Sequence, residues 1–342
     1  MPFSSTSQVV DQRLAELYER HRPLEDGAVA NYYESGREYY DAADARAEAG
    51  HFAIALATRF GDVHVAGDCD LPFALQSLSK VFVYGLALAD NGREHVLAHV
   101  GVEPSGDPFN AIEFDERHHR PHNPMVNAGA LVTSALVHGA DTHEKFERIL
   151  GMLRTYAGND SLEVNSRIFE LEMRSADRNR ATAYLMRSQG MVAGDVEEIL
   201  GLYLQQCSVM VTCRDIAVMA ATLANGGVNP LTGDRALPCA NVRDVLSVMY
   251  TCGMYDAAGQ WAYEVGVPAK SGVSGGILAA IPEKVGLGVF SPGLDVYGNS
   301  VRGVRVCHEI SERLGLHVFA TEGEDALLGA NRGDNGAGPG PK

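Results

Sequence analysis

Strand-type sequence occurs near both ends of this chain, and a long helical region separates the two groups. The strand patterns are at residues 51–58, 63–66, 261–267, 276–281 and 285–291. Residues 77–226 have almost entirely helical periodicity, and 300–314 carries apolar residues at helical spacing. Strands this far apart can share a sheet only if the chain returns to it after the helical region. We therefore expect an α+β fold, an antiparallel sheet flanked by helices with an inserted all-helical lobe.

The same patterns predict how the 342 residues are divided. The predicted units are an N-terminal helical extension (1–26, with a helix over 10–21), an α/β lobe made from 27–90 and 228–320, a helical lobe (91–227) and a disordered tail (321–342). With 46% hydrophobic residues, the chain is long enough to bury a large core in two lobes. The tail is rich in Gly, Pro and Asn, a composition that does not build a packed core.

A serine lies three residues before a lysine at the start of an apolar helical run. Residues 77–89 (SLSKVFVYGLALA) read as a buried helix that ends at Asn91 and Gly92. Ser77 and Lys80 would share one helix face, and burial would lower the lysine pKa enough to activate the hydroxyl. The alternative is that Ser77 caps the helix and Lys80 is solvated.

A second motif, KSGVSGG, occupies residues 270–276, directly before an apolar strand pattern. Lys270, Ser271 and Gly272 form a K-[ST]-G triplet, which together with S-x-x-K is typical of penicillin-binding proteins and serine β-lactamases. However, the central region contains neither an S-D-N triplet nor a class A glutamate motif. A β-lactam substrate is therefore disfavoured.

The central region carries a more specific pattern. Residues 122–130 (HNPMVNAGA) resemble the hallmark sequence of the serine-dependent glutaminases. Further matches are 27–32 (GAVANY), 172–179 (EMRSADRN), 219–227 (MAATLANGG), 252–260 (CGMYDAAGQ) and 268–276 (PAKSGVSGG). The likeness covers roughly 27–319, so the chain is identified as a member of this family.

This resemblance implies a β-lactamase-like fold and hydrolysis of L-glutamine to L-glutamate and ammonia. Ser77 would form a γ-glutamyl ester, Lys80 would activate it, and the backbone N–H groups of Ser77 and Val273 would form the oxyanion hole. We expect no cofactor and no metal, and a homo-oligomer, either a dimer or a tetramer.

The resemblance also implies a set of substrate-binding residues. These are Tyr32, Ser77, Asn127, Glu172, Asn179, Tyr203, Tyr255 and Val273, with Gln76 and Lys270 in support. The Glu172 carboxylate suits the substrate ammonium, and Asn179 would lie two turns further along the same helix face. A solvated charged helix is the alternative. Because residues 39–44 look like an insertion, Tyr39 or Tyr40 could replace Tyr32.

Three further assignments have alternatives. Asn127 follows Asn123 and Pro124, an expected N-cap and N1 pair, and could face a cleft or be a satisfied core amide. Tyr203 lies between two leucines, so its alternative role is packing in the hydrophobic core. Tyr255 lies in an expected loop before the K-S-G strand, so it is the preferred proton carrier, with its phenolate stabilised by the two lysines.

Composition excludes several classes of protein. The net charge of −16 argues against nucleic acid, whose phosphates require clustered Lys and Arg. We find no signal peptide and no apolar run long enough to span a membrane, which predicts a cytoplasmic protein. The six cysteines have no C-x-x-C spacing and the histidines no H-E-x-x-H spacing, so we expect reduced thiols and no metal site.

Two other functions remain open at this point. One is a serine acyl-hydrolase acting on β-lactams or peptides, and the other is a non-catalytic amino-acid sensor that keeps the fold. The intact Ser77, Lys80 and Tyr255 argue against the sensor.

Overall fold

The computed structural model describes residues 3–30, 50–106, 111–115 and 117–320. Its centre is a five-stranded antiparallel sheet with the order β3-β2-β8-β7-β6. The strands are β2 (Ala53–Thr58), β3 (Val63–Gly67), β6 (Ala269–Ser271), β7 (Gly276–Ile281) and β8 (Val285–Phe290). Strands β2 and β8 lie side by side although they come from opposite ends of the sequence, with Ala55 opposite Gly288. The predicted fold class is confirmed.

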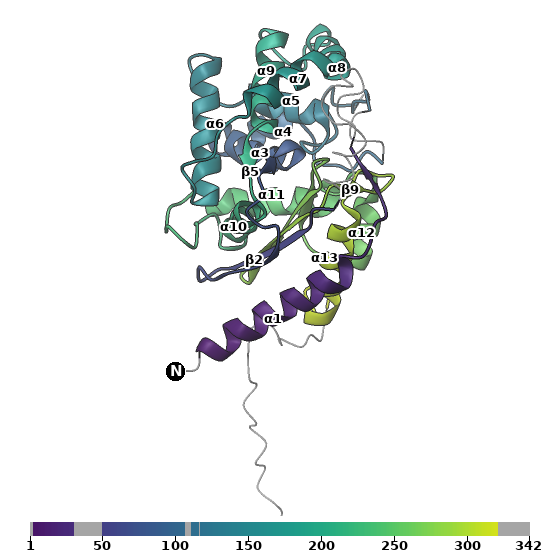
Figure 1. Cartoon of the computed structure of the whole chain (residues 1–342). Helices are drawn as coiled ribbons and strands as arrows, with labels where there is room; N and C mark the ends of the chain where they lie inside the picture. Colours follow the sequence, from purple (N-terminus) through teal and green to yellow (C-terminus); the bar gives the residue numbers. More distant parts are fainter. Residues whose placement is uncertain (1–2, 31–49, 107–110, 116, 321–342) are drawn as a thin grey trace, which may run out of the picture.

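Helices cover both faces of this sheet (Figure 1). They are α1 (Phe3–His21), α3 (Ser79–Asn91), α4 (Arg93–His99), α5 (Asn127–Ala135), α6 (Thr142–Ala157), α7 (Ser166–Ser175), α8 (Asp177–Ser188), α9 (Val196–Cys207), α10 (Cys213–Ala224), α11 (Cys239–Cys252), α12 (Ala258–Glu264) and α13 (Val301–Leu314). Short elements complete the description: η1 (Gln76–Leu78), η2 (Tyr255–Ala257), β1 (Ala28–Val29) paired with β9 (Gly293–Leu294), and β4 (Phe73–Ala74) paired with β5 (Met210–Val211).

Residue size differs between the two faces of the sheet. Small residues on β2, such as Ala55, belong to the core shared with α10, whereas Ile54 belongs to the core shared with α1 and α13. A Cβ atom at Gly286 would lie 2.0 Å from the Ala221 nitrogen, so β8 needs glycine here for α10 to pack this closely. The predicted helical lobe included α10, but this helix packs against the sheet; the division into lobes stays a prediction.

The predicted N-terminal helix is present and begins earlier than expected, at Phe3. Leu14 on α1 is fully buried against the other face of the sheet. Asp11 accepts a 2.7 Å hydrogen bond from His64 on β3, and His21 bonds Glu309 on α13 at 2.8 Å. In Figure 1, α1 (purple) accordingly lies along the sheet beside α13 (yellow).

The strand expected at 261–267 is wrong, because α12 occupies most of this segment. Its aromatic and β-branched residues resemble a strand in composition, but Ala258, Trp261 and Val265 are buried at helical spacing. The Trp261 indole N–H also donates to the Val267 carbonyl at 2.8 Å.

The tail at 321–342 and the tyrosines 32, 39 and 40 lie outside the described residues. Of the six cysteines, only Cys239 is exposed, and none is in a disulfide in the structure.

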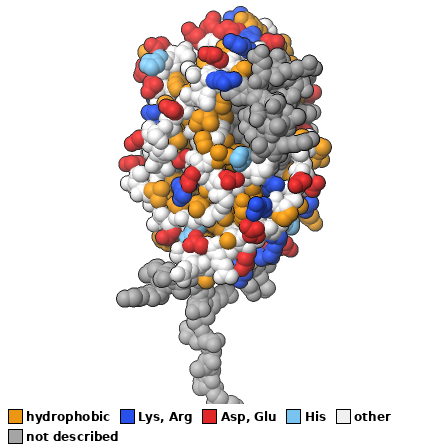
Figure 2. Space-filling view, in the orientation of Figure 1, with side chains coloured by type: hydrophobic (Ala, Val, Ile, Leu, Met, Phe, Trp, Pro, Cys, Tyr) orange, Lys and Arg blue, Asp and Glu red, His pale blue; other side chains and the backbone are white. Residues whose placement is uncertain are grey.

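Among the residues described, no helix combines the length and the apolar character needed to cross a bilayer. Figure 2 shows acidic side chains spread over the visible face, with Lys and Arg scattered among them.

Candidate active site

Ser77 lies in the single 3-10 turn η1, which leads directly into α3. The flanking Leu75 and Leu78 are fully buried, and the Leu75 N–H donates to the Val209 carbonyl at 2.8 Å. Gln76 has a φ of +50°, which is uncommon for a residue other than glycine. The turn therefore holds Ser77 at the start of a helix, where backbone N–H groups are free to stabilise negative charge.

Lys80 belongs to the first turn of α3 and is completely buried. Burial lowers the pKa of Lys80 from 10.5 to about 8, because the charged ammonium loses its hydration. Its Nζ donates to Asn127 Oδ1 at 2.7 Å. Lys80 thus loses its proton more readily than a solvated lysine does, and its complete burial rules out the solvated alternative.

Asn127 connects several of the predicted residues. Its Oδ1 also accepts a hydrogen bond from the Tyr203 hydroxyl at 3.2 Å, and its Nδ2 donates to Asn179 Oδ1 at 2.9 Å. Asn127 is the first residue of α5, and the N-cap is Val126 rather than the expected Asn123. Asn123 instead closes a turn before the helix by accepting from the N–H groups of Met125 and Val126.

Glu172 and Asn179 do not share one helix as predicted. The helix breaks at Ala176, so Glu172 lies on α7 and Asn179 on α8. Gln76 Nε2 donates to Glu172 Oε1 at 2.8 Å, which links the carboxylate to the Ser77 turn. Burial raises the pKa of Glu172, and the hydrogen bond from Gln76 opposes that rise. Glu172 is therefore a largely desolvated carboxyl group, suited to pairing with a cation.

Tyr255 begins the 3-10 turn η2 with a φ of +53°. The neighbouring Ser77 side chain lowers the pKa of Tyr255, but burial has the larger effect and raises it well above its ordinary value. Lys270 Nζ lies 4.1 Å from the centre of the Tyr255 ring and donates to the carbonyls of Gly253 (3.0 Å) and Ser271 (2.6 Å). The predicted stabilisation of the phenolate is wrong, because burial also lowers the pKa of Lys270 and so weakens the positive charge beside the ring.

Val273 lies in the turn between β6 and β7 and lines a pocket of about 210 Å³ together with Gln76 and Ser274. The Ser274 Oγ is buried and has no hydrogen-bond partner within the described part of the chain. Gly298 closes this side of the site, because a Cβ atom there would lie 3.6 Å from both the Tyr255 ring and the Val273 side chain.

Sequence reasoning missed Cys207, Ser274 and Gly298. Cys207 is buried beside the site, with its Sγ 3.9 Å from Ser79 Oγ. Its position four residues after Tyr203 on α9 was a usable signal, since such residues share a helix face. Burial raises the pKa of Cys207 to about 12, so this thiol stays neutral.

The structure thus brings together most of the predicted residues. Lys270 Nζ lies over the Tyr255 ring beside Ser77, Gln76 donates to Glu172, and Asn127 is hydrogen-bonded to Lys80, Asn179 and Tyr203. Tyr203 is fully enclosed, and burial raises its pKa well above 10. No cluster of potential metal-binding side chains occurs within the described ranges.

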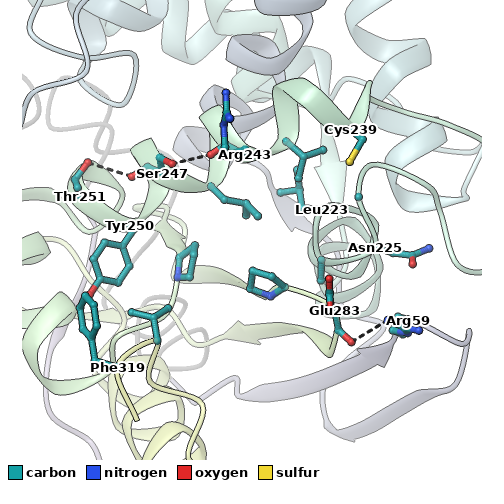
Figure 3. A pocket seen from close by; sticks show the side chains of 17 residues that line it. Arg59, Leu223, Asn225, Cys239, Arg243, Ser247, Tyr250, Thr251, Glu283 and Phe319 are labelled. Carbon is teal, nitrogen blue, oxygen red and sulfur yellow. Dashed lines mark hydrogen bonds between the residues drawn. The ribbon is translucent and has the colours of Figure 1, made fainter. Parts of the chain in front are cut away.

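A larger pocket of about 870 Å³ lies elsewhere, between α11, the β7–β8 turn and Phe319 (Figure 3). It is lined by Arg59, Tyr250, Glu283 and other residues that include none of the predicted site residues. The larger pocket and the buried polar contacts around Ser77 therefore lie at different places in the fold.

Comparisons with known proteins identify the family of the chain. The glutaminase family model matches residues 39–319. Glutaminases of Nostoc sp. and Trichormus variabilis are each 52% identical over 304 residues, which is 89% of this chain and 88% of the relative.

Solved structures extend the comparison to the fold. A structure of Mglu in its glutamate form is 43% identical, with a TM-score of 0.83, covering 91% of this chain and 70% of that one. The probable glutaminase ybaS is 38% identical, with a TM-score of 0.84, over 93% and 99% of the two chains. The chain shares the β-lactamase-like fold with these neighbours and belongs to the glutaminase family of enzymes.

Proposed function

We propose that this protein hydrolyses L-glutamine to L-glutamate and ammonia through an ester between Ser77 and the γ-carbonyl of the substrate. The observation that carries the proposal is a buried serine beside Tyr255, three residues before a completely buried lysine whose pKa is lowered to about 8. Glu172, Asn127 and Asn179 supply the charge and the amide groups that an α-amino acid requires.

In the first half of the reaction, Ser77 Oγ attacks the γ-carboxamide carbon. The Ser77 proton passes to neutral Lys80, with the Tyr255 hydroxyl as a relay that accepts one proton and donates another. Tyr255 is a neutral relay in this scheme because its raised pKa disfavours a standing phenolate. The N–H groups of Ser77 and Val273 stabilise the oxyanion, and protonated Lys80 returns the proton to the departing ammonia.

In the second half, water attacks the ester carbon and the same groups act in reverse. Water gives a proton towards Lys80, and Ser77 recovers its proton as the ester bond breaks. Throughout the cycle, Glu172 pairs with the substrate ammonium. Lys270 supports the Tyr255 ring, and Gln76 orients Glu172.

Ammonia release from L-glutamine tests the reaction, and a reactive diazoketone analogue of glutamine tests the nucleophile. Mass spectrometry should place the adduct on Ser77; an adduct on another residue would overturn this assignment.

A chromogenic cephalosporin assayed beside glutamine separates the proposal from a β-lactam hydrolase. Absence of turnover at saturating glutamine would favour the sensor.

The dependence of kcat/KM on pH is expected to report Lys80. Lys80 must be neutral to accept a proton, so activity should rise with pH and level off above its pKa of about 8. Asn127→Asp would place a negative charge where Nζ now donates at 2.7 Å, favour the ammonium form and move this midpoint to higher pH. A profile that is flat from about pH 6.5 to 9.5 would exclude Lys80 as the base.

Tyr255→Phe should lower kcat by about 10²-fold, a typical contribution from proton transfer, with a smaller change in KM. Tyr203→Phe is the matched comparison, because its hydroxyl donates to Asn127 and is expected mainly to position groups. If Tyr203→Phe loses kcat while Tyr255→Phe keeps it, the two roles must be exchanged.

A further inference from the structure

Two cysteines outside the proposed mechanism lie close to each other. Cys69 follows β3, and Cys213 is the first residue of α10, so most of the helical region separates them in the sequence. Both are buried, and the two thiols are near enough to shift each other's pKa, which is lowered for Cys69 and raised for Cys213. The other four cysteines have no such thiol partner recorded in the described structure.

Backbone contacts place the two cysteines together independently of their side chains. The Arg214 N–H donates to the Cys69 carbonyl at 3.4 Å, which brings the two stretches of main chain side by side. Cys69 Sγ lies 3.2 Å from the Ile54 carbonyl on β2, and Cys213 Sγ lies 3.3 Å from the Gly288 carbonyl on β8.

Those two carbonyls belong to adjacent positions of one strand pair, since Ile54 is opposite Val289 and Ala55 is opposite Gly288. Both sulfur atoms therefore lie over one small area of the sheet. A disulfide requires a Cα separation of about 4.4–6.8 Å, which is within reach of main-chain segments joined by such a hydrogen bond.

The local chemistry also favours reaction at Cys69. The neighbouring Cys213 lowers the pKa of the Cys69 thiol, and the nearby Arg214 acts in the same direction. By contrast, burial raises the pKa of Cys207, Cys252 and Cys307. The neighbours of Cys69 in the sequence, Asp68 and Asp70, are exposed, so this thiol lies just beneath the surface.

We propose that Cys69 and Cys213 form a reversible disulfide, a redox-modification site separate from the catalytic groups. With a peroxide as oxidant, Cys69 sulfur takes one peroxide oxygen to become a sulfenic acid, and water leaves. The Cys213 sulfur then attacks this sulfur, the S–S bond forms, and a second water leaves. Overall, two thiols and one hydrogen peroxide give one disulfide and two waters; a dithiol reverses the reaction by exchange.

The disulfide would tie the segment before Ser77 to α10. Residues 69–76 run from Cys69 through β4 to the catalytic turn, and at present Asp70 pairs with Arg214 at 3.2 Å. The bond would close a loop that contains nearly the whole helical region. Such long loops restrict the unfolded chain strongly, so we expect Tm to rise by about 5 °C or more on oxidation.

The experiment uses the full chain with Cys239→Ser, which removes the exposed thiol that could link two molecules. The protein is treated with hydrogen peroxide, unfolded, alkylated and digested without reduction. Mass spectrometry should find one cross-linked peptide pair containing Cys69 and Cys213, together with the higher Tm. Dithiothreitol should reverse both changes.

Adding Cys69→Ser should abolish the cross-link and the Tm rise, while adding Cys307→Ser, at a buried cysteine on α13, should leave both intact. Serine at position 69 keeps a donor for the Ile54 carbonyl, so the fold should tolerate Cys69→Ser. If this variant nevertheless folds poorly, the peptide map of the Cys239→Ser protein still shows whether Cys69 and Cys213 are cross-linked. Full alkylation of both cysteines, a cross-link between other cysteines, or a Cys69 sulfinic acid without the bond would overturn the proposal.

Discussion

Ser77→Ala is expected to lower kcat for glutamine hydrolysis by about 10⁴-fold or more, because no other group can take the place of the hydroxyl that forms the ester. The fold should survive, since the change removes one oxygen from a turn held by Leu75 and Leu78. Glutamine binding should also survive, because Glu172 and Asn127 are untouched. Steady-state ammonia release and calorimetric titration with glutamine measure the two effects separately.

Ser79→Ala is the matched control for this change. Ser79 lies two residues further on and is also buried, but its hydroxyl lies by the Cys207 sulfur. The activity of the Ser79→Ala enzyme should stay within about threefold of wild type, since this position takes no part in the proposed chemistry. Equal losses in the two variants would mean that damage to the turn, rather than loss of a nucleophile, explains the Ser77 result.

Glu172→Gln should raise KM for glutamine by about 30-fold or more with a smaller change in kcat. A desolvated pair between the carboxylate and the substrate ammonium is worth about 2–5 kcal/mol, and the amide replaces the charge without changing the shape. Burial raises the pKa of Glu172, so the wild-type KM should also increase on the acid side as this carboxylate takes up a proton.

Glu170→Gln provides the control, because Glu170 lies on the same helix and is exposed. It should leave KM unchanged. A KM for Glu172→Gln within about twofold of wild type would show that another group binds the ammonium.

The sheet and its motifs were predictable because each depends on local sequence. The hairpin of β2 and β3 and strands β7 and β8 follow from alternation and turn residues, and Ser77 and Lys80 follow from their spacing before an apolar helix. The segment at 261–267 was not predictable in this way. Its residues favour a strand by composition, and burial of Trp261 in the core beneath β6 and β7 decides for a helix.

The contacts within the site depended on tertiary structure. Asn127 joins Lys80, Tyr203 and Asn179 only because α3, α5, α8 and α9 meet there. The break at Ala176 and the environment of Tyr255 likewise have no local signature. From the sequence, two lysines near a tyrosine predict a stabilised phenolate. Burial lowers the pKa of both lysines, so they carry less positive charge to stabilise it.

The left-handed backbone at Gln76 and Tyr255 implies a trade-off between stability and activity. Each conformation costs a non-glycine residue on the order of 1 kcal/mol, and both residues are neighbours of Ser77, Gln76 in the sequence and Tyr255 in space. Glycine at either position would relieve this strain but remove a side chain of the site, either the Gln76 amide that donates to Glu172 or the Tyr255 hydroxyl beside Ser77. Selection for thermal stability alone would therefore favour glycine at both positions, and the most heat-resistant variants of this turn would be among the least active.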